Sequence, residues 1–174
     1  MLLKFILITN IFLLLLYAQK SNTELLGDIF RVIIPLSAYS TTLYLNDKEG
    51  EIEFYKSLGT TVGATYTLKY SVKKERPNSE DYRSFPSGHT SATFGSASFI
   101  HIRYGLKYAI LPYIASAYTG YSRVYSDQHY SEDVIAGALI GVISSWYFTS
   151  SYKDINIEPL SRSGYNGVKL SYFW

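Results

Sequence analysis

The chain has 174 residues, a formal net charge of +2 and 47% apolar residues. This length predicts a single domain, and the absence of a long basic run argues against nucleic-acid binding. Since there is no cysteine, disulfides, thiolate catalysis and a thiolate zinc site are excluded.

Residues 1–21 are predicted to be a targeting segment. Lys4 gives a positive start, and the run from Phe5 to Tyr17 is mostly apolar. Such a run has the length of a signal-peptide core and is short for a transmembrane helix. Because no clear cleavage site follows it, an uncleaved N-terminal membrane anchor stays open as the alternative.

Residues 22–150 are predicted to form one helical domain. Apolar periodicity and turn residues predict a capping turn at 21–24 and then helices over 28–45, 51–72, 88–103, 106–121 and 131–150. Pro35 should kink or break the first of these helices. Gly59 and Gly63 have the spacing of a close helix contact. The expected fold class is therefore all-α, a single bundle of about five to six helices.

Residues 151–174 form a C-terminal tail of different character. Proline and glycine punctuate it, and apolar and polar residues alternate from Val168 to Trp174. This alternation predicts an irregular or strand-like tail with a short strand or hairpin.

Three short stretches within the helical domain carry polar groups suited to an anion. In the first, Lys69 and Arg76 are seven positions apart, which two helical turns would place on one face, and Pro77 follows where a helix should stop. The alternative for this pair is a solvated helix face. For Lys73 and Lys74, a favourable interaction with the helix dipole is the preferred interpretation.

The second stretch is the turn Pro86-Ser87-Gly88-His89, which opens a helix. Free backbone N–H groups at a helix start form a ready anion site. Ser87 adds a hydroxyl donor, Gly88 lets the backbone come close, and His89 can donate a proton. The alternative is an ordinary capping turn with a surface histidine.

The third stretch, residues 122–133, contains Arg123, His129 and Asp133. His129 and Asp133 are four positions apart and share a face in a helix or its first turn. An imidazole beside a carboxylate is a tuned nucleophile or base, and Arg123 offers a planar fork for phosphate or carboxylate. The alternative is a helix start that Asp133 stabilises, with His129 incidental.

Other combinations of these residues are less favoured. A metal site of His89, His101 and His129 lacks a histidine pair of ligand spacing, so His101 is interpreted as a packing or surface residue. A triad of Ser87, His129 and Asp133 would leave the cations without a role, and Pro-Ser-Gly-His is not a nucleophile elbow. Three further acidic residues are interpreted as solvated loop or cap residues: Asp81, Asp127 and Glu132.

Together the three stretches resemble the type 2 phosphatidic acid phosphatase superfamily, which also includes bacterial acid phosphatases and vanadium haloperoxidases. Its signatures are Lys-x6-Arg-Pro, Pro-Ser-Gly-His and Ser-Arg-x5-His-x3-Asp, and every signature position is matched in order. The matches span residues 69–133, and the flanking helices fit the helical bundle of that family. The loop over residues 78–85 is short for the family, which bears on the substrate entrance.

The resemblance implies a metal-independent phosphatase without a cofactor. His129 would attack phosphorus and form a phosphohistidine, Asp133 would orient its ring, and His89 would protonate the leaving oxygen and then activate water. A set of cationic and hydrogen-bonding groups would bind the phosphate: Lys69, Arg76, Ser87, Gly88 and Arg123.

The substrate implied is a phosphomonoester or pyrophosphate, preferably of a lipid such as phosphatidate, phosphatidylglycerophosphate, prenyl pyrophosphate or a lipid A phosphate. The tyrosine-rich helices also favour contact with a membrane surface. The expected location is the periplasm, by export or anchoring, with an integral inner-membrane protein as the alternative. The alternative functions are a soluble non-specific periplasmic acid phosphatase and, more remotely, a vanadate-dependent haloperoxidase or a non-catalytic lipid-binding protein.

Overall fold

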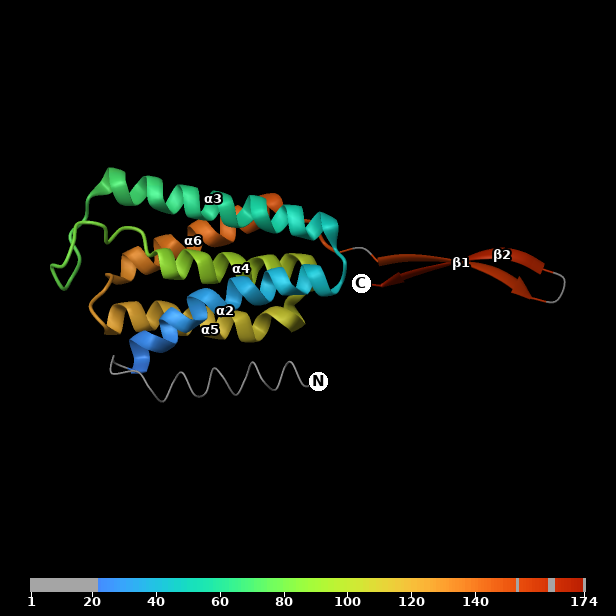
Figure 1. The fold of residues 1–174 in the computed structure, drawn as a ribbon, viewed down its shortest axis with the longest axis horizontal. Helices are drawn as coiled ribbons and strands as arrows, with labels where there is room; N and C mark the ends of the chain where they lie inside the picture. The colour runs from blue at the N-terminus through green and yellow to red at the C-terminus, as the bar shows by residue number, and fades with distance from the viewer. Residues whose placement is uncertain (1–21, 153, 163–164, 174) are drawn as a thin grey trace.

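The computed structural model describes residues 22–152, 154–162 and 165–173 (Figure 1). The elements run in the order α2 (Asn22–Tyr44), α3 (Lys48–Val72), α4 (Gly88–Tyr104), α5 (Leu106–Tyr125), α6 (Ser131–Phe148), β1 (Asp154–Arg162) and β2 (Tyr165–Phe173). The two strands pair antiparallel, with Asp154 opposite Phe173. The predicted all-α bundle with a strand-like tail is therefore confirmed. The predicted targeting segment lies outside the described residues.

Two predicted helix boundaries are wrong. The first helix does not start near residue 28, because α2 runs without a break from Asn22 and Pro35 lies inside it. Asp28 is therefore within a helix and does not cap one. The predicted helix over 106–121 continues for about one more turn, and α5 ends at Tyr125.

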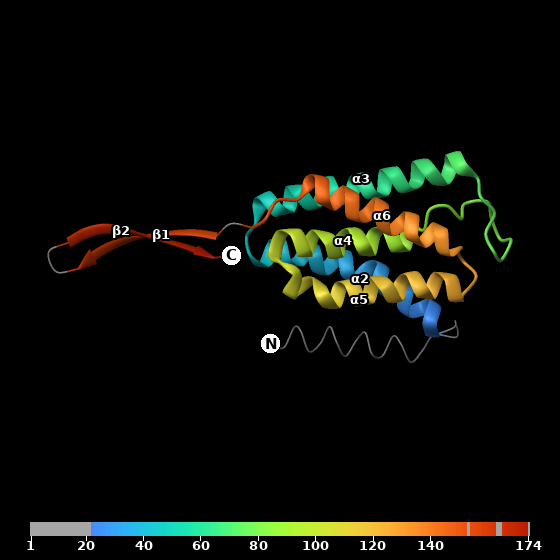
Figure 2. The same ribbon diagram turned by 180° about the vertical axis from the view of Figure 1, so that it is seen from behind.

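Helix α4 lies at the centre of the bundle and packs most extensively against α6 (Figures 1 and 2). Glycines make this approach close, since a Cβ at Gly137 or Gly141 would collide with a backbone carbonyl oxygen of α4 or of the residue just before it. The contact predicted at Gly59 and Gly63 is wrong. A Cβ at either position would have no described atom within 4 Å, because both lie on an exposed face of α3.

Apolar side chains form a small core in the half of the bundle away from the loop between α3 and α4. Its buried members are Ala38, Phe54, Phe99, Ile100 and Ala109. Hydroxyl groups join the helices both in this half and nearer the loop. Ser57 shares a hydrogen bond of 2.7 Å with Ser145, and Thr65 donates one of 3.0 Å to Ser91. Small polar side chains allow the helices to approach closely while their hydroxyl groups stay bonded.

The outer faces of the helices carry many apolar side chains. On α6 these are Ile135, Leu139, Ile143 and Trp146, each more than half exposed. The inner face of the same helix carries the glycines that contact α4. Among the described helices, none has the length and hydropathy needed to cross a bilayer.

The end of the bundle away from the α3–α4 loop is closed by Arg103, whose side chain is 2% exposed. Its Nε and one terminal nitrogen donate to the two carboxylate oxygens of Asp47, at 2.8 and 2.6 Å. Two further carboxylates accept from the same guanidinium, Glu49 at 3.1 Å and Glu53 at 3.3 Å. Although burial opposes the effect, the bond from Arg103 lowers the pKa of Asp47.

Candidate active site

A cavity of about 200 Å³ lies where α3 and α5 end and α4 and α6 begin. Its lining consists of Arg31, Tyr66, Lys69, Arg76, Asp81, Arg83, Gly88, His89, Arg123, Gln128 and His129. Six of the eight residues predicted from the motifs are in this lining, and the two others, Ser87 and Asp133, are not. The three motifs therefore meet at one place.

Lys69 reaches the cavity from the last turn of α3 and is 9% exposed. Its ammonium group donates to the backbone oxygens of Arg83, at 2.7 Å, and Ser84, at 3.5 Å. Burial, with a further contribution from the Arg76 charge, lowers the pKa of Lys69 to about 8. The ammonium group is thus a buried cation near its titration point, held by neutral oxygens.

Arg76 is positioned by the loop and not by a helix, so the predicted shared helical face with Lys69 is wrong. Helix α3 ends at Val72, and Lys73 then adopts a left-handed conformation with φ of 49°. The Arg76 guanidinium donates to Asp81 Oδ1 and to Gln128 Oε1, both at 2.8 Å. Asp81 is therefore an ion-pair partner and not a solvated loop residue. Although burial opposes it, the bond from Arg76 keeps the pKa of Asp81 below its usual value.

Arg123, in the last turn of α5, is 3% exposed and contacts the start of α2. Its two terminal nitrogens donate to Asp28 Oδ1 at 3.0 Å and to the Glu24 backbone oxygen at 2.6 Å. Gly27 makes this contact possible, because a Cβ there would collide with the Ser122 hydroxyl and lie 2.8 Å from the Arg123 guanidinium.

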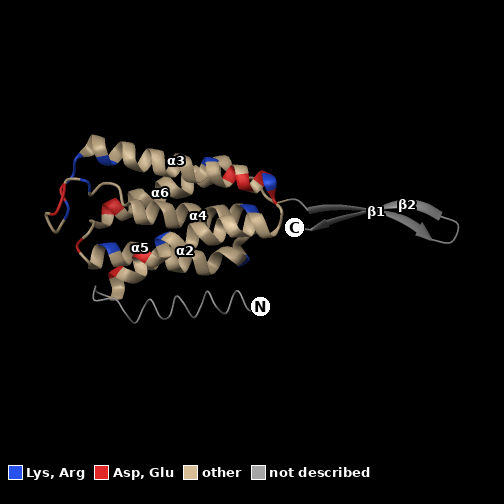
Figure 3. Cartoon of the chain, viewed as in Figure 1, with Lys and Arg blue, Asp and Glu red and all other residues tan. Residues whose placement is uncertain are grey.

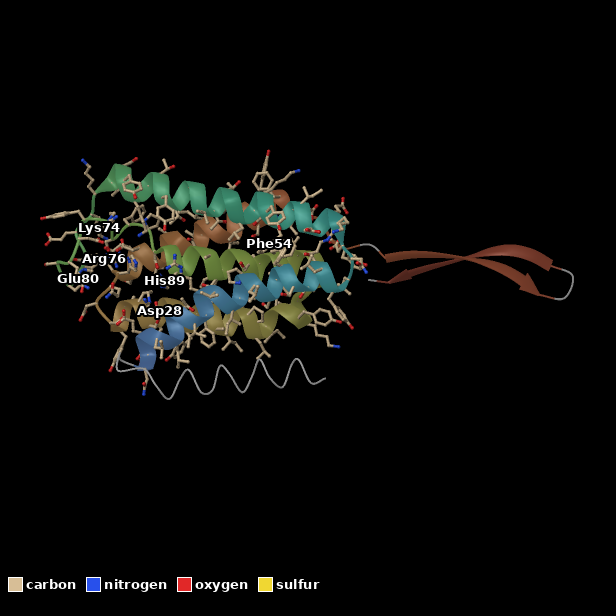
Figure 4. All side chains as sticks on the ribbon, in the orientation of Figure 1. Asp28, Phe54, Lys74, Arg76, Glu80 and His89 are labelled. Atoms are coloured by element: carbon tan, nitrogen blue, oxygen red, sulfur yellow. The ribbon has the colours of Figure 1, made fainter. Side chains whose placement is uncertain are left out.

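His89, in the first turn of α4, faces the cavity with its side chain 19% exposed. Its Nε2 lies 2.8 Å from Asp28 Oδ1, and Figure 4 shows these two side chains at the same end of the bundle. Burial and the charges of Arg123 and Arg31 lower the pKa of His89 to about 4, and Asp28 opposes this shift. His89 is thus not an incidental surface histidine.

His129 lies in the turn between α5 and α6, 3% exposed, where its backbone N–H donates to the Arg123 oxygen at 3.1 Å. Burial lowers the pKa of His129 to about 3, with further contributions from the charges of Lys69 and Arg76. Its Nδ1 is buried, lies 3.9 Å from Asp133 Oδ2 and has no hydrogen-bond partner among the described residues. The two side chains are neighbours, but the distance is too long for a hydrogen bond.

The fully buried Asp133 carboxylate has other partners. Lys74 donates to Oδ1 at 2.7 Å, while the Ser84 hydroxyl at 2.5 Å and the Tyr130 backbone N–H at 3.1 Å donate to Oδ2. The Lys74 ammonium also contacts Glu132 at 2.7 Å. Lys74 is thus a counterion of Asp133, and the interpretation as a helix-end cation is wrong.

Ser87 caps α4 instead of facing the cavity. Its buried hydroxyl shares a hydrogen bond of 3.0 Å with Thr90 Oγ1 and accepts one of 3.5 Å from the Thr90 N–H. The hypothetical triad of Ser87 with His129 and Asp133 is therefore not formed. His101 lies twelve residues beyond His89, roughly 18 Å along α4, and its Nδ1 is 3.2 Å from the Tyr113 hydroxyl.

Four polar residues around the cavity were not found from the motifs: Asp28, Arg31, Arg83 and Gln128. Asp28 had one local signal, since it is a lone acidic residue among apolar ones, but that signal equally fits a helix cap. Across the part of the chain that the structure describes, no group of three histidine or acidic side chains is suited to a metal ion.

Comparison with known proteins gives three kinds of match. The family described as the PAP2 superfamily matches residues 50–157. Lipid A 1-phosphatase of Porphyromonas gingivalis is 36% identical over 78 residues, which are 43% of this chain and 18% of that protein. Lipid phosphate phosphatase 1 of Arabidopsis thaliana is 31% identical over 100 residues, 49% of this chain and 30% of that protein. The matches thus cover less than a third of these relatives.

The crystal structure of Aquifex aeolicus LpxE shares the fold. Its TM-score is 0.62 at 23% sequence identity, and the superposition covers 80% of this chain and 92% of that one. The match therefore extends beyond the segment that carries the motifs to most of the helical bundle.

Proposed function

The chain belongs to the PAP2 superfamily, and from this membership we propose that it hydrolyses a phosphate ester of a lipid through a phosphohistidine at His129. The observation that carries the proposal is the convergence of two histidines and the three cations of the motifs, from separate elements, on one cavity. Lipid A and lipid phosphates are named as substrates of similar proteins. A phosphate monoester of a lipid is therefore the proposed substrate class.

Charge supports phosphate binding in this cavity. Lys69, Arg76 and Arg123 line it, and a phosphate monoester carries close to two negative charges at neutral pH. The start of α4 adds the backbone N–H groups around Gly88. Donors fixed in place before substrate arrives stabilise the charge that develops on the equatorial oxygens in the transition state.

The proposed nucleophile is Nε2 of His129, because Nδ1 is buried and lies beside the Asp133 carboxylate, which is not part of the cavity lining. The low pKa of His129 leaves the imidazole neutral at pH 7, so a lone pair is available for attack. As the N–P bond forms, the ring gains positive charge and Nδ1–H requires an acceptor. Asp133 Oδ2, at 3.9 Å, needs an approach of about 1 Å to accept that hydrogen bond.

His89 is the proposed acid and base. It gives a proton to the leaving oxygen as the P–O bond breaks, and it then takes a proton from the water that attacks phosphohistidine. The second attack breaks the N–P bond and returns the electron pair to His129. The products are an alcohol and inorganic phosphate, and both histidines are restored.

Exposed tyrosines near the ends of α3 and α5 support a lipid substrate. Tyr66 lines the cavity and stacks on Tyr70, and Tyr121 stacks on Tyr125 at the end of α5. All four rings are about half exposed or more. Because tyrosine suits a lipid–water interface, this arrangement supports a site at a membrane surface. The periplasmic face is the proposed location.

The experiment measures phosphate release by the purified full-length chain, with chelator present, from a panel of lipid and soluble phosphates. His129→Ala should abolish turnover, whereas His101→Ala, a change of the same kind on the far part of α4, should retain it. A denaturing alkaline quench with radiolabelled substrate should trap phosphate on the wild-type protein only. Full activity in His129→Ala would overturn the mechanism, and preference for soluble esters would favour a non-specific acid phosphatase.

A further inference from the structure

Asp28 connects two of the proposed active-site groups from outside all three motifs. Its Oδ1 lies 2.8 Å from His89 Nε2 and 3.0 Å from an Arg123 terminal nitrogen. It belongs to α2, which precedes the segment matched by the family profile. Figure 4 shows Asp28 and His89 at the same end of the bundle.

The hydrogen bond decides which nitrogen of His89 is available to the substrate. An ionised carboxylate can only accept, so Nε2 carries the hydrogen that Asp28 accepts. Nδ1 has no hydrogen-bond partner among the described residues and belongs to a ring that lines the cavity. Asp28 thus fixes both the orientation of the ring and the identity of its free nitrogen.

The other charged groups around His89 disfavour its protonation. Arg31 on α2 and Arg123 on α5 both lower its pKa, and His129 faces the same cavity from the turn before α6. Lys69 on α3 lies close to the start of α4, with its Cε 3.7 Å from the place where a Gly88 Cβ would be. Asp28 is the acidic group whose charge and hydrogen bond favour the protonated ring.

Asp28 is also held firmly in place. Arg123 donates to both Asp28 and the Glu24 backbone oxygen, one helical turn earlier. Gly27 packs directly on Ser122, so the start of α2 cannot shift toward α5 without a collision. A carboxylate held in this way suits the orientation of a neighbouring ring better than a mobile surface group.

We propose that Asp28 is the positioning residue for His89 and keeps Nε2–H bonded so that Nδ1 exchanges the proton with the leaving oxygen and then with water. The proposal rests on the proposed function, since it assigns the proton transfers to His89. The charge of the bound phosphate favours protonation of the ring, so the first step starts from doubly protonated His89. Its Nδ1 proton passes to the leaving oxygen as the P–O bond breaks, and in the second step Nδ1 takes a proton from the attacking water, which restores the doubly protonated ring. The Nε2–H bond to Asp28 persists throughout.

The test compares Asp28→Asn with the wild-type full-length chain on two phosphate monoesters that differ in leaving group. An alkyl phosphate needs a proton donor, whereas an aryl phosphate with an acidic phenol needs little help. We expect kcat to fall about 10²-fold for the alkyl ester and by much less for the aryl ester. Asp127→Asn is the matched control, an exposed aspartate at a positive φ that asparagine tolerates, and it should leave both rates unchanged.

A double variant tests whether Asp28 acts through His89. Adding Asp28→Asn to His89→Ala should produce no further loss with the alkyl ester, because the orienting group then has no ring to hold. The proposal would be overturned if the kcat of the double variant fell by the product of the two single-variant losses. It would also be overturned if Asp28→Asn lowered kcat equally for both esters. Asp28→Asn should still form the trapped phosphoenzyme from the aryl ester. If the wild-type protein itself forms no phosphoenzyme, that result counts against the proposed function and not only against the role of Asp28.

Discussion

The two ends of the helical bundle each bury an arginine, but the partners of that arginine differ. At the far end Arg103 donates to three carboxylates, those of Asp47, Glu49 and Glu53. At the loop end Arg123 shares one carboxylate with His89 and otherwise donates to neutral oxygens. Most charged positions of the described helices and loops gather toward these two ends (Figure 3).

This difference separates a structural arginine from one suited to ligand binding. The charge of Arg103 is more than balanced by the surrounding carboxylates, and no further anion is needed. The cavity lining at the loop end instead contains one acidic residue, Asp81, and five cations, and Asp28 contacts two of the lining residues; the cations are Arg31, Lys69, Arg76, Arg83 and Arg123. A surplus of positive charge around a cavity favours an anionic ligand.

The strongest test of this comparison removes the structural arginine. Arg103→Met leaves the buried Asp47 carboxylate without its main counterion, and we expect a loss of about 3–5 kcal/mol in the free energy of unfolding. Urea denaturation followed by circular dichroism measures this loss. The kcat of the folded fraction should stay close to that of the wild type, and a selective loss of turnover would contradict the structural assignment.

Replacing the arginine of the loop end should lower activity more than stability. Arg123→Met removes a proposed donor to the phosphate, and we expect kcat/KM to fall by about 10²–10³-fold. Its effect on stability should be smaller than that of Arg103→Met, because the Asp28 side chain is 36% exposed and water can solvate it. The kinetic constants and the free energy of unfolding of both variants are measured by the same assay and the same urea denaturation.

A third test uses the low pKa of Lys69, a property that no arginine shares. Above pH 7.5 inorganic phosphate is mainly a dianion and both histidines of the free enzyme are neutral, whereas Lys69 has a pKa of about 8. Its charge is lost as pH rises through about 8. We therefore expect the inhibition constant of phosphate to rise by up to about tenfold per pH unit above this value.

Lys69→Arg supplies the control for that measurement. Arginine keeps its charge throughout this range, so the inhibition constant should become nearly independent of pH between about 7.5 and 9.5. A wild-type inhibition constant that stays flat across the same range would show that the Lys69 charge does not contribute to phosphate binding.

The smallest effect is expected for an exposed ion pair near the far end. Lys48 contacts Glu51 at 2.9 Å, but its side chain is 78% exposed. Lys48→Ala should therefore change the free energy of unfolding by less than about 1 kcal/mol and leave kinetics unchanged. A loss as large as that of Arg103→Met would mean that burial does not explain the difference between these cations.

Local sequence spacing was sufficient for the helices and for most of the cavity lining. Apolar residues at helical period predict where the helices lie, and the spacing of polar residues within the three motifs indicates which residues line the cavity. Spacing failed where two explanations share one pattern. Ser87 and Asp28 are both residue types that cap helices or line sites; Ser87 caps α4, whereas Asp28 contacts His89 and Arg123 and caps no helix.

By itself, the sequence determined the helical bundle, the strand-like tail and six residues of the cavity lining: Lys69, Arg76, Gly88, His89, Arg123 and His129. Only the tertiary structure decided their partners, because Asp28 and Arg123 are 95 positions apart and Lys74 and Asp133 are 59 apart. Such pairs depend on how α2, α4, α5 and α6 pack, and glycine contacts between the helices set that packing. A local motif can predict which side chains line a cavity. Which other side chains orient these residues and shift their pKa values depends on contacts between distant segments.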